Sequence, residues 1–117
     1  MKENVILEKS FQFSVRIVNL HKYLTAQKRE FILSKQICRS GTSIAANVFE
    51  AQRGQSMADF NSKFHIALKE ANETQYWLAL LHETAYISDR AFQSLDTDLK
   101  EVLRILTAIC KRVKDKL

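Results

Sequence analysis

The chain has 117 residues, no proline, two glycines and a net charge of +5, with 46% apolar and 26% charged residues. So few turn-forming residues exclude β-sandwiches and α/β folds, which need a turn about every ten residues. The apolar fraction is large enough to build a core and excludes an intrinsically disordered chain. We therefore predict one all-α domain over residues 1–117, made of a few long helices.

Apolar residues at helical spacing predict four helices along the chain. Ser56 and Ser88 are expected to be the N-caps of the third and fourth helices, and Gly54 is expected to end the second in the left-handed conformation. Short connections between long helices predict an antiparallel up-down-up-down four-helix bundle. The expected helices span about residues 4–26, 30–53, 56–87 and 88–117.

The cysteines and the apolar runs indicate where the protein resides. Cys38 and Cys110 lie far apart and outside any C-x-x-C pair, so both are predicted to be reduced core residues. The first thirteen residues include four charged side chains, unlike the apolar region of a secretory signal. The longest uncharged run, Ser40–Phe49, is much shorter than the ~20 residues of a membrane span. We expect a cytoplasmic protein with no membrane partner.

The sequence contains no recognisable pattern for a metal, a cofactor or a catalytic group. His21, His65 and His82 lack the preceding glutamate of di-iron bundles. The segment His82–Tyr86 begins like H-E-x-x-H but has tyrosine in place of the second ligand. Two glycines thirteen residues apart cannot form a phosphate-binding loop. We therefore predict that the protein is not an enzyme, while a catalytic triad dispersed over several helices stays open.

Two of the expected helices carry apolar residues on two sides. Phe11 and Val18 lie across the 4–26 helix from its core stripe, and Ile66, Trp77 and Leu80 lie across the 56–87 helix from its own. Large exposed apolar patches usually mark an interface, and tryptophan is a favoured anchor of interfaces. These five residues are predicted to line a homo-oligomer interface with Trp77 near its centre. The alternative is an irregular bundle that covers both faces itself.

A narrow polar line runs beside the apolar stripe of the 30–53 helix. Its members are Gln36, Arg39, Ser43, Asn47 and Glu50. On the next helix Glu73 interrupts the second apolar face, where a carboxylate is costly unless it is hydrogen-bonded or paired. We expect Arg39, Ser43 or Asn47 to supply its donors, within the chain or across subunits. The alternative is that all of these side chains are solvated.

Positive charge gathers near two helix ends. The first cluster is Lys22, Lys28 and Arg29, and the second is Lys111, Arg112, Lys114 and Lys116. Antiparallel helices place the clusters at opposite ends of the bundle. Such cations also complement helix dipoles. Repeated in an oligomer, they would bind RNA or DNA through phosphates, with steep salt dependence and little sequence specificity. No aromatic residue is expected among them as a stacking platform.

One motif of the chain resembles a known family. The chain contains the element S-I-x-x-N-x-x-E, an arginine four residues before it, and W-L near the end of the next helix. This pattern resembles that of the 23S rRNA intervening-sequence proteins, or S23 family. The resemblance covers nearly the whole chain. The family usually has proline and glycine where this chain has Ala45 and Ala51, and both changes favour an uninterrupted helix. The residues that match are Arg39, Ser43, Ile44, Asn47, Glu50, Phe60, Phe64, Ala67, Leu68, Glu73, Thr74, Trp77 and Leu78.

The resemblance implies a bacterial four-helix bundle that assembles as a ring, commonly a pentamer. A related bundle is the accessory protein of diversity-generating retroelements, which partners a reverse transcriptase and binds nucleic acid. Together with the charge pattern, this favours a homo-oligomer that binds RNA or DNA electrostatically. The alternative is a scaffold that docks a partner enzyme, such as a reverse transcriptase, without contacting nucleic acid.

Overall fold

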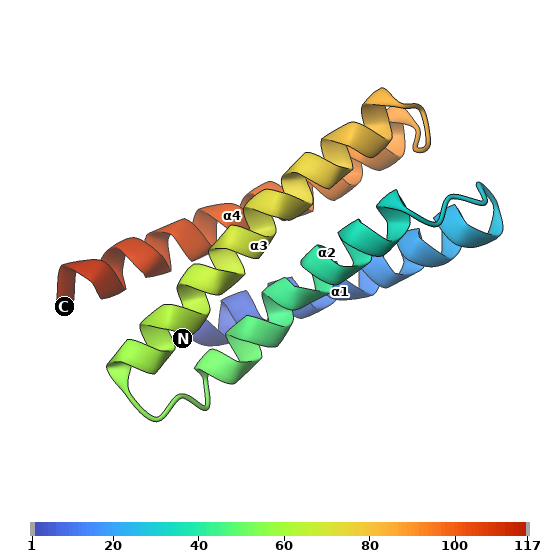
Figure 1. The fold of residues 1–117 in the computed structure, drawn as a ribbon. Helices are drawn as coiled ribbons and strands as arrows, with labels where there is room; N and C mark the ends of the chain where they lie inside the picture. Colours follow the sequence, from blue (N-terminus) through green and yellow to red (C-terminus); the bar gives the residue numbers. More distant parts are fainter. Residues whose placement is uncertain (1, 117) are drawn as a thin grey trace.

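A computed structural model of the protein describes the backbone of residues 2–116 and the side chains of residues 5–112. Both α1 and α3 pack against α2 and α4, so α1 and α3 occupy diagonal corners of the bundle. Figure 1 shows α1 beginning and α4 ending at the end where α2 is joined to α3. The predicted up-down-up-down four-helix bundle is confirmed. Its helices are α1 (Lys2–Ala26), α2 (Leu33–Ala51), α3 (Met57–Glu83) and α4 (Asp89–Lys116).

A continuous apolar core runs between the four helices along the 45 Å length of the bundle. Each helix contributes one stripe of fully buried side chains, as helical spacing predicts. Ala45 lies in this core within an unbroken α2, as expected from the absence of proline at that position. Cys110 is also buried, but Cys38 is only half-buried, so the prediction that both cysteines lie in the core is wrong for Cys38. The largest buried side chains include Phe13, Phe64, Ile17, Ile44, Leu78 and Leu106.

The start of α2 is set by a buried carboxylate rather than by the apolar pattern. Glu30, predicted to be helical, lies before the helix and accepts hydrogen bonds from the backbone N–H groups of Ile32, Leu33 and Ser34 at 3.1, 2.9 and 2.7 Å. Burial raises the pKa of Glu30, but these backbone donors outweigh burial and hold the pKa below its usual value. The carboxylate therefore satisfies the free amides at the positive end of α2.

The end of α3 is set by a left-handed residue that is not glycine. Ala85 has φ 66°. The N–H of Tyr86 donates to the carbonyl of Leu81 at 2.9 Å, and the N–H of Ala85 donates to the carbonyl of His82 at 3.0 Å. These are the two hydrogen bonds of a Schellman motif. The predicted continuation of α3 to Ile87 is therefore wrong, because the backbone turns four residues earlier.

Two serines cap helices as predicted. The hydroxyl of Ser56 accepts a hydrogen bond from the N–H of Asp59 at 3.0 Å, and that of Ser88 accepts one from Ala91 at 3.1 Å. The left-handed stop expected at Gly54 is wrong, because neither glycine of the chain has a positive φ.

Candidate functional site

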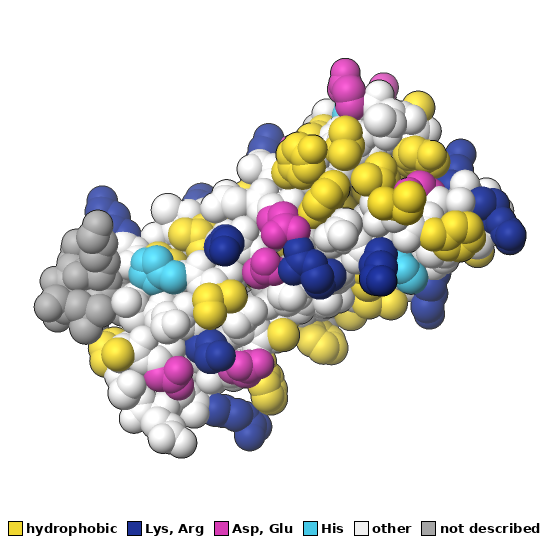
Figure 2. Space-filling view, viewed as in Figure 1, with side chains coloured by type: hydrophobic (Ala, Val, Ile, Leu, Met, Phe, Trp, Pro, Cys, Tyr) yellow, Lys and Arg dark blue, Asp and Glu magenta, His cyan; other side chains and the backbone are white. Residues whose placement is uncertain are grey.

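A cluster of charged side chains joins α2 to α3 on their shared outer face. The guanidinium of Arg39 donates from Nη1 to Glu70 Oε2 at 3.1 Å and from Nη2 to Glu73 Oε2. The indole Nε1 of Trp77 donates to the same Glu73 oxygen at 3.0 Å. Figure 2 shows acidic and basic side chains side by side near the middle of this face, with hydrophobic side chains gathered beside them. We call Arg39, Glu70, Glu73 and Trp77 the Arg39 cluster.

The Arg39 cluster favours the charged form of Glu73. The hydrogen bond from Trp77 and the ion pair with Arg39 together outweigh burial and keep the pKa of Glu73 below its usual value. The hydrogen bond to Glu73, helped by the charge of Glu70, raises the pKa of Arg39 against the effect of burial. Glu70 is almost completely buried, so the cation that faces it offsets a large desolvation cost.

The polar side chains along α2 bond partly to α3 and partly to the backbone of α2 itself. Arg39 binds Glu73 as predicted, but Ser43 and Asn47 do not. The Ser43 hydroxyl donates to the carbonyl of Arg39 at 2.7 Å, and the Asn47 amide donates to the carbonyl of Ser43 at 2.8 Å. Glu50 pairs with Lys63 at 3.0 Å. The alternative that the whole line is merely solvated is therefore wrong.

The sequence patterns missed the part that two members of the Arg39 cluster play, because Glu70 accepts from Arg39 and Trp77 donates to Glu73. Glu70 was not singled out, although its four-residue spacing from Thr74 and its position on the core side of α3 are visible in the sequence. Trp77 was assigned to an interface alone, because a sequence does not show which way an indole N–H points. Beneath the cluster, the buried hydroxyl of Thr74 donates to Ser40 at 2.9 Å and adds a second link between the helices.

The predicted interface residues lie on two neighbouring sides of the bundle. Phe11 is 59% exposed and Val18 is 39% exposed, on the side formed by α1 and α2. There an apolar groove of about 410 Å³ runs between the helices. We call this the α1–α2 face, lined by Leu7, Phe11, Val15, Val18, Ala46 and Phe49.

The second side is formed by α2 and α3. Ile66 is 40% exposed, while Trp77 and Leu80 are half-buried. We call this the α2–α3 face, and its members are Ile66, Trp77 and Leu80 together with Arg39 and Glu73. The bundle covers these faces in part, because Trp77 packs against the core while Phe11, Val18 and Ile66 remain exposed.

The basic clusters lie at opposite ends of the bundle, as predicted. Lys22, Lys28 and Arg29 are exposed at the α1–α2 connection, and Lys111 is exposed near the end of α4 at the other end (Figure 1). Arg112 is half-buried. The side chains of Lys114 and Lys116 lie outside the described residues.

One expectation about the basic residues is wrong. Aromatic rings do lie among them, because the guanidinium carbon of Arg29 is 5.8 Å from the ring centroid of Phe31. A second pair, Arg53 and Phe49, is 4.8 Å apart at the other end of α2. The contact between Arg29 and Phe31 lies in a connection, where helical spacing does not apply. Arg53 and Phe49 are four residues apart, the helical spacing, across the end of α2.

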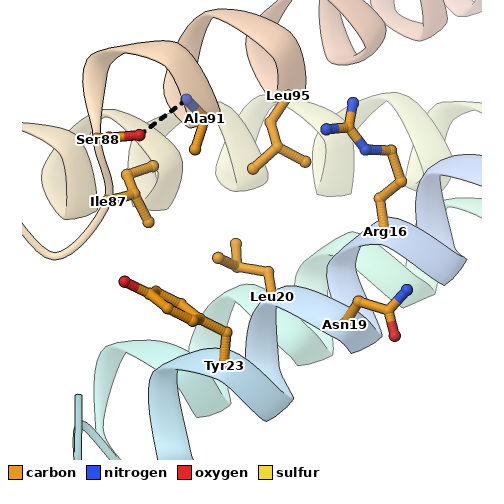
Figure 3. Close-up of a pocket in the computed structure, with 8 residues that line it drawn as sticks. All are labelled: Arg16, Asn19, Leu20, Tyr23, Ile87, Ser88, Ala91 and Leu95. Atoms are coloured by element: carbon orange, nitrogen blue, oxygen red, sulfur yellow. Dashed lines mark hydrogen bonds between the residues drawn. The ribbon is translucent and has the colours of Figure 1, made fainter. Parts of the chain in front are cut away.

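A pocket of about 470 Å³ opens on the seam between α1 and α4, near the α3–α4 connection. Figure 3 shows Leu20 and Tyr23 of α1 facing Ile87 and the start of α4 across this space. Arg16 borders it, but its guanidinium is already bonded to Asp98 at 2.7 Å and to Ser94. The pocket therefore offers mainly apolar surface rather than a set of acid–base groups.

Two further properties concern the described part of the chain only. Among its side chains, no group of three His, Cys, Asp or Glu residues is placed to hold a metal ion. None of its helices is both long enough and apolar enough to cross a membrane.

Comparison with known proteins identifies the family of this bundle. The family model described as 23S rRNA-intervening sequence protein matches residues 2–108. The chain is 54% identical to a protein of unknown function from the S23 ribosomal protein family of Bacteroides thetaiotaomicron, whose crystal structure superimposes with a TM-score of 0.93. That match covers 95% of this chain and 99% of the other. No curated protein sequence matches the chain. The chain belongs to the family of 23S rRNA-intervening sequence proteins.

Proposed function

We propose that this protein is a non-enzymatic homo-oligomer, with a pentamer favoured, that binds RNA or DNA electrostatically and with little sequence specificity. The observation that carries the proposal is the division of its surface. Two adjacent sides of the bundle expose apolar residues, and positive charge is placed at the ends. Subunits would contact one another through the apolar sides, and the positively charged ends would remain accessible to a polyanion.

The position of the two faces favours a closed ring. The α1–α2 face and the α2–α3 face are neighbouring sides that meet at α2, so they lie roughly at a right angle to each other. A head-to-tail contact between unlike faces turns the assembly at every subunit, and such contacts close a ring when the rotation per subunit divides a full turn. Two faces on opposite sides would instead build a straight filament. The pentamer itself is favoured by what the family resemblance implies.

The Arg39 cluster supports the same use of the α2–α3 face. Charged groups inside an apolar interface favour one register over others, because a shifted partner would leave them unpaired. Trp77 is a suitable anchor, and its N–H is already satisfied by Glu73. The face can therefore be covered by a partner without burying an unbonded indole.

Nucleic acid binding is supported by the repetition of basic clusters in an assembly. Each copy adds Lys22, Lys28 and Arg29 at one end and the α4 cluster at the other, so a ring carries two zones of positive charge. Such zones bind phosphates rather than base edges.

Mobility shifts with structured RNA at several salt concentrations test the proposal. We expect binding at low salt that weakens steeply as salt rises and changes little with sequence. Replacement of Lys111, Arg112, Lys114 and Lys116 by glutamine is expected to weaken binding uniformly across sequences if that end is the contact. Absence of RNA and DNA binding at low salt would contradict the proposal.

A second candidate is a scaffold that docks a partner enzyme, a reverse transcriptase being one, without contacting nucleic acid. The apolar pocket between α1 and α4 favours it, because it remains outside both proposed subunit faces. An assembled ring that fails to bind nucleic acid would favour this reading.

A further inference from the structure

We infer that the α1–α2 connection is a binding site for single-stranded nucleic acid, in which an unpaired base stacks on Phe31. The inference rests on the proposed nucleic-acid function and adds the class of ligand and the residue that holds it. We call Phe31, Arg29, Lys28 and Lys35 the Phe31 platform. Figure 2 shows Lys and Arg side chains together with hydrophobic ones over this end of the bundle.

The exposure of apolar side chains at this connection is the first observation. Phe31 is 56% exposed and its neighbour Ile32 is 75% exposed, directly before α2. Lys28 and Arg29 precede them, and Lys35 is exposed in the first turn of the helix. An exposed aromatic ring surrounded by cations is the arrangement that binds single strands, because bases stack on the ring while cations meet the phosphates.

The charge of the connection is the second observation. In sequence, Glu30 would cancel one of the two neighbouring cations. In the structure its carboxylate is turned inward and is occupied by three backbone N–H groups of the α2 N-terminus. The outward surface of the connection is therefore more positive than its composition suggests. The carboxylates at this end, Glu83 and Asp89, belong to the α3–α4 side, so a polyanion would approach over α1 and α2.

The backbone of Arg29 is the third observation. Its φ is 54°, a left-handed conformation that costs a residue other than glycine about 1 kcal/mol. The guanidinium of Arg29 lies over the ring of Phe31. Strained residues of this kind often mark functional positions. The same conformation lets the N–H of Glu30 donate to the carbonyl of Leu24 at 3.0 Å at the end of α1, so the position serves the helix end as well as the proposed site.

A base fits between the two groups once the side chain of Arg29 moves outward by about 1 Å. The guanidinium carbon is 5.8 Å from the ring centroid. A base sandwiched between two planes needs about 7 Å, twice the contact distance of about 3.5 Å. Arg29 is exposed, so a small rotation of its side chain opens that space. The base would then stack on Phe31 and beneath the guanidinium, and adjacent phosphates would contact Lys28 and Lys35. Bases paired within a duplex cannot enter such a site.

The test compares two fluorescein-labelled probes, a single-stranded oligouridine and a duplex RNA of equal length, by fluorescence anisotropy at low salt. Phe31→Leu keeps an apolar side chain but removes the ring. We expect it to weaken single-strand binding about tenfold and duplex binding less than twofold. Arg29→Gln is expected to weaken single-strand binding more than Arg53→Gln, a matched loss of charge in the other arginine–phenylalanine pair.

Crosslinking locates the contact directly. A 5-iodouridine oligonucleotide irradiated with the wild-type protein and digested with trypsin is expected to label the peptide Glu30–Lys35. Equal binding of both probes with no effect of Phe31→Leu, or labelling confined to other peptides, would overturn the inference and leave the proposed function intact. A changed mass of Phe31→Leu in light scattering would also overturn it, because Phe31 would then be a subunit contact. Failure of the wild type to bind either probe would instead refute the proposed function.

Discussion

Gly41 of α2 lies directly against Ile17 of α1, so closely that a Cβ added to the glycine would be 2.9 Å from both Cγ1 and Cγ2 of the isoleucine. Real Cβ atoms do not approach other atoms so closely, and Ile17 is fully buried. The two helices can therefore keep their present separation only with glycine at this position. Gly41 costs some helix propensity, and the packing against Ile17 offsets that cost.

Gly41→Leu is expected to lower the free energy of unfolding by about 3 kcal/mol, because the added side chain must push α1 away from α2. Urea denaturation followed by circular dichroism measures the change. Lys35→Leu, which adds a leucine on the exposed side of α2, is the control and is expected to change stability by less than about 0.5 kcal/mol. Unchanged stability of Gly41→Leu would show that the close approach is not required.

Glu30→Gln removes the negative charge that caps α2 and is expected to cost about 1 to 2 kcal/mol at neutral pH. Folding lowers the pKa of Glu30, so its stabilisation is complete above the unfolded pKa of about 4.3 and disappears as pH falls through the folded pKa. The stabilities of wild type and variant, measured by urea denaturation, should therefore differ at about pH 7 and converge as pH falls below the folded pKa. A difference that does not depend on pH would contradict the cap.

Ala85→Gly is expected to stabilise the protein by up to about 1 kcal/mol, because glycine adopts the left-handed conformation without the cost borne by alanine. Ala79→Gly, at an exposed position inside α3, should destabilise the protein by about 1 kcal/mol. Thermal unfolding of both variants measures the opposite signs. Destabilisation by both substitutions would contradict the Schellman ending of α3.

Arg39→Gln leaves the buried Glu70 and its neighbour Glu73 without their cation. We expect a loss of about 1 to 2 kcal/mol, less than for a fully buried pair because Arg39 is half exposed. Lys63→Gln, which breaks the pair with the exposed Glu50, should cost less than Arg39→Gln. Both are compared by denaturation at one protein concentration, because assembly would make stability depend on concentration. Equal losses would contradict a special role for the cluster.

The helices and the core were predictable because apolar residues repeat at helical spacing along the sequence. Phe13, Ile17, Phe64 and Leu78 recur at helical spacing, and each is buried. The ends of the helices depend on single residues instead. Glu30 caps α2 from outside it, and Ala85 ends α3 where nothing in the sequence distinguishes it from a helical alanine.

The candidate site was predictable only where a general rule about burial applied to its residues. The cost of burying a carboxylate limited the expected donors of Glu73 to Arg39, Ser43 or Asn47, and the structure shows that Arg39 is the one. The contact between Arg29 and Phe31 lies in a connection where Arg29 has a left-handed backbone, and no helical pattern reveals either feature.

The mass of the protein in solution tests the central claim most directly, because the ring underlies both proposed functions. Multi-angle light scattering at micromolar concentration is expected to give a defined multiple of the 13.6 kDa chain mass, with five copies favoured. Replacement of Trp77 and Phe11 by polar residues should reduce that mass, because it weakens the apolar contacts of both faces. A wild-type mass of one chain would contradict the assembly and leave its two exposed apolar faces without the partner proposed for them.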